Sequence, residues 1–204
     1  MPKYERYQDY VIREGKLVGE FEEMYQDFDD PWNQSAEHEA LEKDIAIRLL
    51  SEAPGIKTVV ELGCGFGDFT ARIADAGLNA IGIDISETAI AKAKKRHPAA
   101  AFRAGTITDF SLLKSLAPDV IVMAEITWYI LDSLRPFLSF LKADMPNTSL
   151  LHLLTTYPEG TQKYGRDHFT SLDEMRSFFG MRYRSYGVIP HNGTFRTWFW
   201  GDWH

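Results

Sequence analysis

The chain has a single cysteine, no long apolar run and no long basic block. Because Cys64 has no second cysteine to pair with, an internal disulfide is excluded and nothing points to an oxidising compartment; a structural zinc site is equally disfavoured. The segment from Met1 to Tyr10 is polar and aromatic, without the apolar core of a signal peptide, and no stretch is long enough to span a bilayer. We therefore expect a soluble, cytoplasmic protein with no bound metal and no membrane partner.

The charge balance argues against nucleic acid as a partner. The chain carries 29 acidic and 22 basic residues, for a net charge of -7. Its one basic run, residues 92–96, follows a helical pattern and precedes Pro98, as expected of cations in the last turn of a helix. At 204 residues, 45% of them apolar, the chain is long enough for one domain and short for two. We predict a single domain, residues 1–204, that acts on a small molecule as a monomer or a homodimer.

From residue 58 onward, short apolar runs alternate with helical patterns. This alternation predicts an α/β fold, with a parallel sheet covered by helices on both faces. Asn192-Gly193 lies between the last two runs, which is a strong signal for an antiparallel hairpin. The expected strands span residues 58–64, 80–84, 101–104, 119–124, 149–155, 183–189 and 194–200, and the expected helices span residues 69–76, 87–97, 134–141 and 171–179.

The N-terminal region has a different composition. Its first thirty residues mix aromatic and acidic side chains without a clear period, which favours a folded cap over a disordered tail. Apolar residues then recur at helical spacing between Leu41 and Leu50, before Pro54-Gly55. We predict a helical cap and the first core helix over residues 1–53, and the sheet core over residues 58–204.

A glycine loop between an apolar strand pattern and a helix is the most informative motif. Gly63, Gly65 and Gly67 are spaced G-x-G-x-G, whereas the dinucleotide fingerprint G-x-G-x-x-G would require a third glycine at Asp68. An acid at the start of that helix would repel a pyrophosphate. The loop suits a cofactor without phosphates, such as S-adenosylmethionine (SAM), whose cationic groups Glu61 and Asp68 could favour directly or through water. The alternative is that the glycines only form a tight turn.

Asp84 ends the second strand pattern and supports the cofactor interpretation. An acid at this strand end can accept hydrogen bonds from both ribose hydroxyls of a nucleoside. The alternative role is that of a helix N-cap, but Ser86 is already available for it. Two acids, Glu61 and Asp84, therefore end two consecutive strands.

With these residues in view, the chain resembles the class I SAM-dependent methyltransferases from Val59 to about Tyr157. Within them it is similar to small-molecule enzymes of the NodS-like N-methyltransferase group, through Asp30-Pro31-Trp32 and the segment from Ala124 to Tyr129. The resemblance implies a seven-stranded, doubly wound, Rossmann-like methyltransferase sheet with the C-terminal hairpin, SAM as the cofactor, and a small-molecule acceptor.

The resemblance also implies roles for individual residues. Ile85 corresponds to a position that packs on the adenine. Thr106 stands where the family often has an acid for the adenine amino group, followed by Ile107, whose backbone amide could reach the ring; Asp109 could compensate or merely solvate a loop. Tyr25 and Trp32 of the cap could act as a lid over SAM or as packing anchors. The expected cofactor-binding residues are Glu61, Gly63, Cys64 (its thiol as a small apolar filler), Gly65, Gly67, Asp84, Ile85, Thr106, Ile107, Trp32 and Tyr25.

Methyl transfer to a hydroxyl or ammonium needs a positioned acceptor and a general base near the methyl group. Glu125 follows a largely apolar strand, in the region that faces the methyl group in this fold, and is the first catalytic candidate; its alternative is a cap or salt bridge. His168, in a polar stretch before a capped helix, is the second candidate, because an imidazole ring can accept a proton. Its alternative is an ordinary solvated side chain. His152, inside a strand pattern, is expected to be a hydrogen-bonded core residue.

These features predict a SAM-dependent methyltransferase that transfers a methyl group to oxygen or nitrogen of a small polar metabolite, such as a sugar or a natural-product intermediate. Two other classes stay open. One is a non-catalytic SAM-binding or regulatory protein. The other is an NAD(P)-dependent oxidoreductase, against which Asp68 and the spacing of the glycine loop argue.

Overall fold

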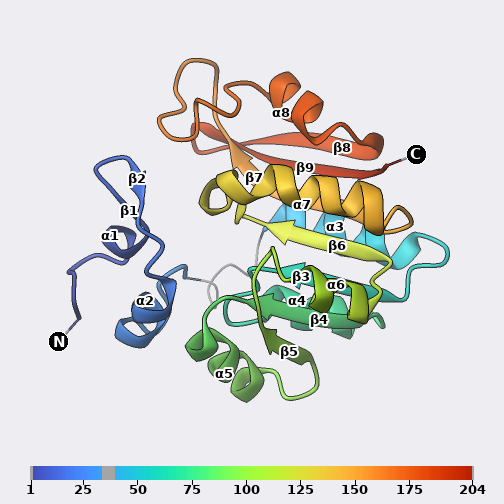
Figure 1. Ribbon diagram of the computed structural model, residues 1–204, viewed down its shortest axis with the longest axis horizontal. Helices are drawn as coiled ribbons and strands as arrows, with labels where there is room; N and C mark the ends of the chain where they lie inside the picture. The colour runs from blue at the N-terminus through green and yellow to red at the C-terminus, as the bar shows by residue number, and fades with distance from the viewer. Residues whose placement is uncertain (1, 34–39, 204) are drawn as a thin grey trace.

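A seven-stranded sheet forms the centre of the protein, as the computed structural model of residues 2–33 and 40–203 shows (Figure 1). The strands are β3 (Thr58–Leu62), β4 (Asn79–Asp84), β5 (Ala101–Ala104), β6 (Val120–Ala124), β7 (Ser149–Thr156), β8 (Arg182–His191) and β9 (Thr194–Asp202). Their order is β5-β4-β3-β6-β7-β9-β8. The first five are parallel, whereas β9 is antiparallel to β7 and β8. The predicted sheet and its C-terminal hairpin are confirmed.

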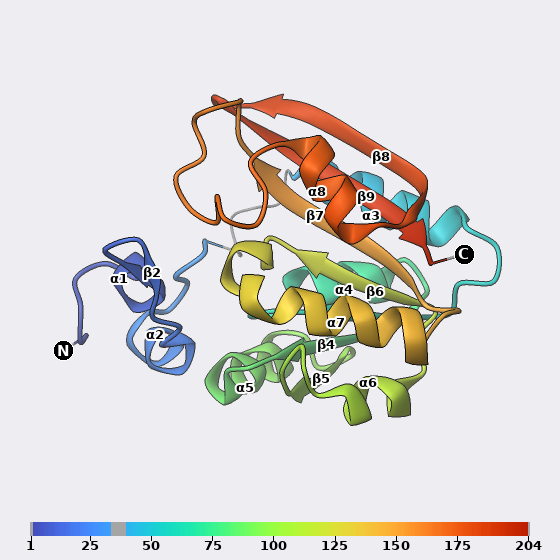
Figure 2. The ribbon, with the colours of Figure 1, turned by 45° about the horizontal axis from the view of Figure 1, so that its top comes forward.

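Helices cover both faces of the sheet (Figure 2). Alternate residues of β3 are buried on opposite faces: Val59 packs in one apolar cluster with Ala46 and Phe69, and Val60 packs in another with Phe137. Because both faces are covered, the central strands are apolar almost throughout. None of the described helices is both long and apolar enough to cross a membrane. The first face carries α3 (Leu41–Glu52), α4 (Asp68–Asp75) and α5 (Glu87–Arg96), and the second carries α6 (Phe110–Leu116), α7 (Leu131–Asp144) and α8 (Leu172–Phe179).

One core helix was not predicted. α6 has seven residues, which is too short for a helical period to stand out in the sequence. Asp109 is its N-cap and accepts a hydrogen bond from the Leu112 amide at 3.5 Å. The structure thus gives Asp109 a local role in starting α6.

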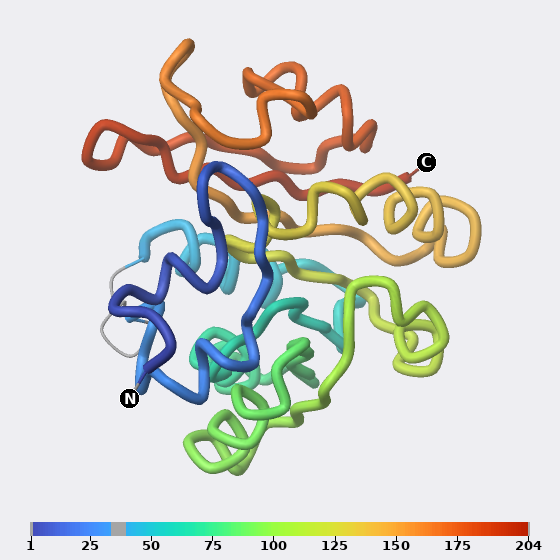
Figure 3. Tube along the Cα trace, turned by 60° about the vertical axis from the view of Figure 1, so that its left-hand side comes forward, coloured from blue at the N-terminus to red at the C-terminus, as the bar shows by residue number. Residues whose placement is uncertain are grey.

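The N-terminal cap contains two helices, as predicted, and also a short hairpin that was not predicted. Its elements are α1 (Gln8–Val11), a hairpin of β1 (Ile12–Arg13) and β2 (Lys16–Leu17), and α2 (Phe21–Asp27). Glu14 and Gly15 both have positive φ, 50° and 76°, as the two-residue turn of a tight hairpin requires. The cap lies beyond the carboxyl ends of the parallel strands (Figures 1 and 3).

The cap is anchored on α5 by buried and charged contacts. Glu22 of α2 accepts hydrogen bonds from the hydroxyls of Ser86, at 2.6 Å, and Thr88, at 2.5 Å. Burial alone would raise the pKa of Glu22, but these hydrogen bonds outweigh it and lower the pKa to about 2. Lys92 donates to the carbonyl oxygen of Tyr25 at 2.6 Å. The cap is therefore fixed over the carboxyl edge of the sheet.

His152 is the hydrogen-bonded core residue that its place in a strand predicts. It is fully buried on β7, its Nε2 is paired with the Thr127 hydroxyl, and its ring lies 4.6 Å from that of Phe179. Its Nδ1 has no hydrogen-bond partner within the described part of the chain. Burial lowers the pKa of His152 to about 3, so the ring is neutral at physiological pH.

This pKa predicts a pH-dependent stability. The unfolded chain protonates His152 below about pH 6.5, whereas the folded protein resists protonation down to about pH 3. The folded state therefore loses roughly 2 kcal/mol of stability from this group between pH 7.5 and pH 5. We expect a His152→Leu variant to lack this pH-dependent term. The amount by which its unfolding free energy, measured in urea, falls below that of the parent should therefore be smaller at pH 5 than at pH 7.5, by roughly 2 kcal/mol. A His191→Leu control, at the exposed end of β8, should show no such change; an unchanged His152→Leu deficit would contradict the assignment.

Candidate functional site

The candidate site lies where the strand order reverses. β3 pairs with β4 on one side and with β6 on the other. The chain continues from β3 to α4 on one face of the sheet and from β6 to α7 on the other face. Ligands of open α/β sheets bind in the crevice at such a point. The glycine loop (residues 63–67) follows β3, and Glu125 follows β6, so both flank this point.

Two glycines of the loop are required by the turn itself. Gly63 has a φ of 71°, and a Cβ placed on it would lie 2.3 Å from Cγ2 of Ile126. Gly67 has a φ of 80°, and a Cβ there would lie 2.3 Å from the Phe102 ring. A tight turn therefore explains these glycines with or without a ligand. Only the side chains around the loop can indicate a cofactor.

Asp84 ties the loop to α5. Its Oδ2 accepts a hydrogen bond from the Gly65 amide and its Oδ1 one from the Ser86 amide, both at 2.9 Å. Burial raises the pKa of Asp84, against the lowering effect of these donors. Ser86 is the N-cap of α5, accepting from the Ala89 amide at 3.0 Å, so Asp84 is not needed for capping. Each carboxylate oxygen keeps a lone pair for another donor, such as a ribose hydroxyl.

Glu61 is an acid buried on β3. Its side chain accepts a hydrogen bond from the Thr70 hydroxyl of α4. Burial raises its pKa to about 7, against the opposing effects of Thr70 and of the Lys43 charge. A carboxyl held in this way is only about half ionised at neutral pH, and a bound cation would favour its charged form.

The predicted adenine side lies next to Asp84. The Gly105 amide donates to the Asp84 carbonyl at 2.9 Å, which places the end of β5 beside the end of β4. Ile85 is 57% exposed, unusual for so large an apolar side chain, and leaves an open apolar surface there. Thr106 is exposed and its hydroxyl lies 3.1 Å from that of Thr108, while Ile107 packs partly against the core.

Two residues of the loop region face elsewhere. The Cys64 thiol is buried with Ile90 and Phe102, as expected of an apolar filler, so only its backbone borders the loop. The Asp68 carboxylate lies 3.3 Å from Nε2 of His97, at the end of α5. Its charge is therefore directed toward the neighbouring helix and away from a ligand on the loop.

The two cap aromatics lie over different parts of the site. Tyr25 is buried, and its ring centroid is 5.1 Å from that of Phe66 in the glycine loop. Burial, and after it the charge of Asp84, raises the pKa of the Tyr25 hydroxyl. Trp32 packs against Tyr129, with ring centroids 5.5 Å apart. Tyr25 thus covers the loop, and Trp32 covers the segment after β6.

Glu125 is held by a network that joins three strands. It has a φ of 59°, a strained conformation for a residue other than glycine. Its carboxylate accepts hydrogen bonds from the amide and hydroxyl of Thr155, at 3.0 and 3.2 Å, and from Arg196 at 3.2 Å. Arg196 also lies 3.9 Å from the buried Glu42. Burial raises the pKa of Glu125, against these donors.

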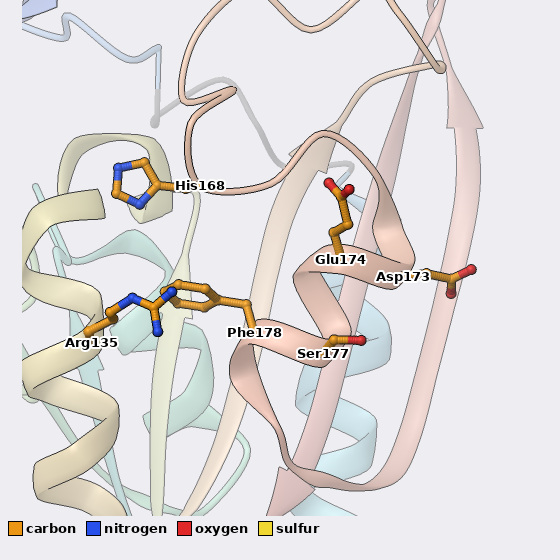
Figure 4. A pocket seen from close by; sticks show the side chains of 6 residues that line it. All are labelled: Arg135, His168, Asp173, Glu174, Ser177 and Phe178. Carbon is orange, nitrogen blue, oxygen red and sulfur yellow. The ribbon is translucent and has the colours of Figure 1, made fainter.

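His168 lies apart from this network. It lines a cavity of about 580 Å³ between α7 and α8 and an adjoining cavity of about 540 Å³ on the cap side of the same loop. In Figure 4 it lies above Arg135, whose guanidinium stacks 4.7 Å from the centroid of the Phe178 ring. Its nearest acid is Asp132, at 4.0 Å. The structure thus brings Glu61, the glycine loop, Asp84 and Ile85 together and leaves His168 on a separate rim.

Sequence reasoning missed Arg196, Glu42 and Glu22. Arg196 was detectable as a lone cation within the otherwise apolar and hydroxyl-bearing run 194–200, since a cation there needs an acidic partner. Glu42 and Glu22 had no comparable signal, because their partners are distant in sequence. Within residues 2–33 and 40–203, no group of three His, Cys, Asp or Glu side chains is arranged to hold a metal ion.

Comparisons with known proteins agree with this geometry. Residues 59–143 match the sequence model of the family described as "Methyltransferase domain", a span that includes the glycine loop, Asp84 and Glu125. No curated protein sequence matches the chain significantly.

Solved structures share the fold. The N-methyltransferase NodS from Bradyrhizobium japonicum, in complex with S-adenosyl-L-homocysteine (SAH), superposes with a TM-score of 0.64 at 20% identity, over 85% of this chain and 93% of that one. Protein PH0226 from Pyrococcus horikoshii gives 0.65 at 16% identity, over 88% and 99%. A TehB-like SAM-dependent methyltransferase from Corynebacterium glutamicum gives 0.57 at 17% identity, over 86% and 96%. Residues 59–143 therefore match a methyltransferase domain, and the chain has the fold of these methyltransferase structures.

Proposed function

We propose that this protein transfers the methyl group of SAM to an oxygen or nitrogen atom of a small polar metabolite, such as a sugar or a natural-product intermediate. One observation carries the proposal. The buried acids Glu61 and Asp84 end adjacent parallel strands beneath a loop that Asp84 itself holds, at the point where the strand order reverses. This arrangement offers one carboxyl to the cationic methionine portion of SAM and the other to its ribose.

The remaining groups of the site have matching roles in the proposal. The exposed Ile85 packs on the adenine, with Thr106 and Ile107 at the ring edge, and the backbone of the loop borders the methionine portion. Tyr25 and the cap exclude water from the bound cofactor. A single domain and a cytoplasmic location are part of the same proposal.

The reaction needs no further cofactor. A lone pair of the acceptor atom attacks the sulfonium methyl carbon in line with the sulfur, the carbon–sulfur bond breaks, and the sulfur keeps the electron pair as SAH is formed. The acceptor proton passes to a base. Glu125 flanks the glycine loop across the switch point, and His168 lines the adjoining cavity, so both are candidates for this base.

Turnover of radiolabelled SAM tests the function. Incubation with [methyl-³H]SAM and an extract of low-molecular-mass metabolites should transfer label to a small molecule and release SAH. Tight binding of SAM without any transfer of label would instead indicate a non-catalytic SAM-binding protein. Binding of NADH in place of SAM would indicate an oxidoreductase.

Substitution of the two candidate bases gives a further prediction. If Glu125 or His168 takes the proton, Glu125→Gln or His168→Ala should slow turnover by on the order of 10²-fold and leave the affinity for SAH within about threefold. His191→Ala, at the exposed end of β8, should have no effect. Full turnover in both variants would exclude them from proton transfer.

A further inference from the structure

A cavity on the cap side of the sheet has features that select its ligand. About 540 Å³ of space lies between the cap hairpin, represented by Gly15 and Leu17, residues 129–133 at the start of α7, and residues 163–168 before α8. These segments approach one another from distant parts of the chain (Figure 3). We call this space the hairpin cavity. Its volume is typical of a site for one small molecule and too small for a folded polymer.

The wall of the hairpin cavity nearest the candidate site is aromatic. Tyr129 follows Glu125 closely and is the last residue of the 3₁₀ turn η1 (Thr127–Tyr129). Its ring is packed by Phe21 and Trp32, with centroids 5.8 and 5.5 Å away. Neither the Tyr129 hydroxyl nor that of Tyr164 has a hydrogen-bond partner among the described residues. The wall thus offers a flat apolar surface with free hydroxyl groups.

The segment of residues 163–168 lines the same cavity and carries two cations with no ion-pair partner among the described residues. Lys163 and Arg166 are exposed, and no carboxylate of the described chain lies within 4.0 Å of either. Asp132 also lines the cavity, but it is 98% exposed and its neighbour is His168, at 4.0 Å. Asp167 is the other acid of the lining. The lining therefore has two cations and two acids, and neither cation has a carboxylate partner among the described residues, in a chain whose net charge is -7.

We infer that the hairpin cavity binds methyl acceptors that combine a ring with an anionic substituent, a carboxylate or a phosphate. The ring packs against Tyr129 and Leu17, and Lys163 and Arg166 bind the anion, with the planar guanidinium suited to two hydrogen bonds at once. This inference rests on the proposed function, because it identifies the cavity as the acceptor side of that site. It adds a substrate class that the methyltransferase fold does not specify.

Binding of two matched probes tests the inference. The probes are 4-hydroxybenzoate and 4-hydroxybenzamide, which share a ring and hydroxyl and differ in charge, titrated calorimetrically with and without saturating SAH. We expect the parent protein to bind the benzoate at least tenfold more tightly than the amide. In a Lys163→Gln/Arg166→Gln double variant this preference should fall below threefold. The matched control Lys94→Gln/Lys95→Gln, two exposed cations on α5, should retain it.

The outcomes separate the two proposals. Equal affinities for both probes in the parent, no detectable binding of either, or a preference that survives in the double variant would each overturn the inference. A phosphate-bearing probe, phenyl phosphate, shows whether the same two cations also bind phosphate. Loss of SAH binding would contradict the proposed function, whereas the anion preference is measured without SAH as well and so tests the cavity on its own.

Discussion

Replacement of Glu61 by glutamine should stabilise the cofactor-free protein at pH 8 and weaken its binding of SAM. The carboxyl is fully enclosed between β3 and α4, where burial raises its pKa from 4.5 to about 7. Because the folded state holds the proton more tightly than the unfolded state, this group stabilises the fold fully below about pH 4.5. That contribution is lost as the pH rises through 7.

The size of the effect follows from the same two pKa values. A shift of about 2.5 units corresponds to roughly 3 kcal/mol of unfolding free energy between the acidic and alkaline limits. The glutamine side chain keeps an oxygen that can accept the Thr70 hydroxyl and does not titrate. Between pH 5 and pH 8 the Glu61→Gln variant should therefore gain roughly 2–3 kcal/mol relative to the parent in urea unfolding. His152 titrates equally in both proteins, so its term cancels in the difference.

Binding should show the opposite effect. The sulfonium and ammonium charges of SAM favour the ionised carboxyl, so SAM binding near pH 6.5 should release a proton from the parent protein. Calorimetry in two buffers of different ionisation enthalpy measures that release, and the Glu61→Gln variant should lack it and bind SAM more weakly. Glu159→Gln, an exposed acid after β7, is the matched control. A Glu61→Gln variant that binds SAM normally, with the same proton release, would remove Glu61 from the site.

The parts of this structure that sequence predicted are those decided by local physics. The strands were found because buried parallel strands are apolar on both faces, and Asp84 was separated from a capping role because Ser86 stands at the cap position. The glycine loop was also found from local physics. Gly63 and Gly67 have a left-handed backbone and closely packed neighbours, and few residues other than glycine fit such positions.

What sequence did not predict depends on pairs that only the fold brings together. Glu125 was identified from its place after an apolar strand, but its carboxylate is held by Arg196, 71 residues away, through the register of β7 and β9. Asp68 was expected to face a cofactor, and its partner His97 lies at the far end of the next helix. The cap hairpin was missed because Glu14, a residue that rarely adopts positive φ, precedes Gly15 in its turn.

Asp84→Asn should abolish the preference of the site for a ribose with both hydroxyls. Asp84 is buried, and its two oxygens already accept the amides of Gly65 and Ser86, so the carboxylate has a fixed orientation toward the cofactor side of the loop. A hydrogen bond to a charged acceptor contributes roughly 1.5–3 kcal/mol. The parent should therefore bind SAH at least about tenfold more tightly than 2′-deoxy-SAH.

This selectivity separates a binding role for Asp84 from a structural one. Asparagine offers one acceptor oxygen where the amides of Gly65 and Ser86 need two, so the variant should also unfold at a lower temperature. A merely loosened loop would weaken SAH and its 2′-deoxy analogue alike and keep their ratio. Loss of a ribose acceptor would instead bring the ratio of the affinities for SAH and 2′-deoxy-SAH below threefold. The control Asp75→Asn, at an exposed acid on α4, should keep the parental ratio. If the Asp84→Asn variant still distinguishes the two ligands tenfold, Asp84 only organises the glycine loop, and the ribose must be bound elsewhere.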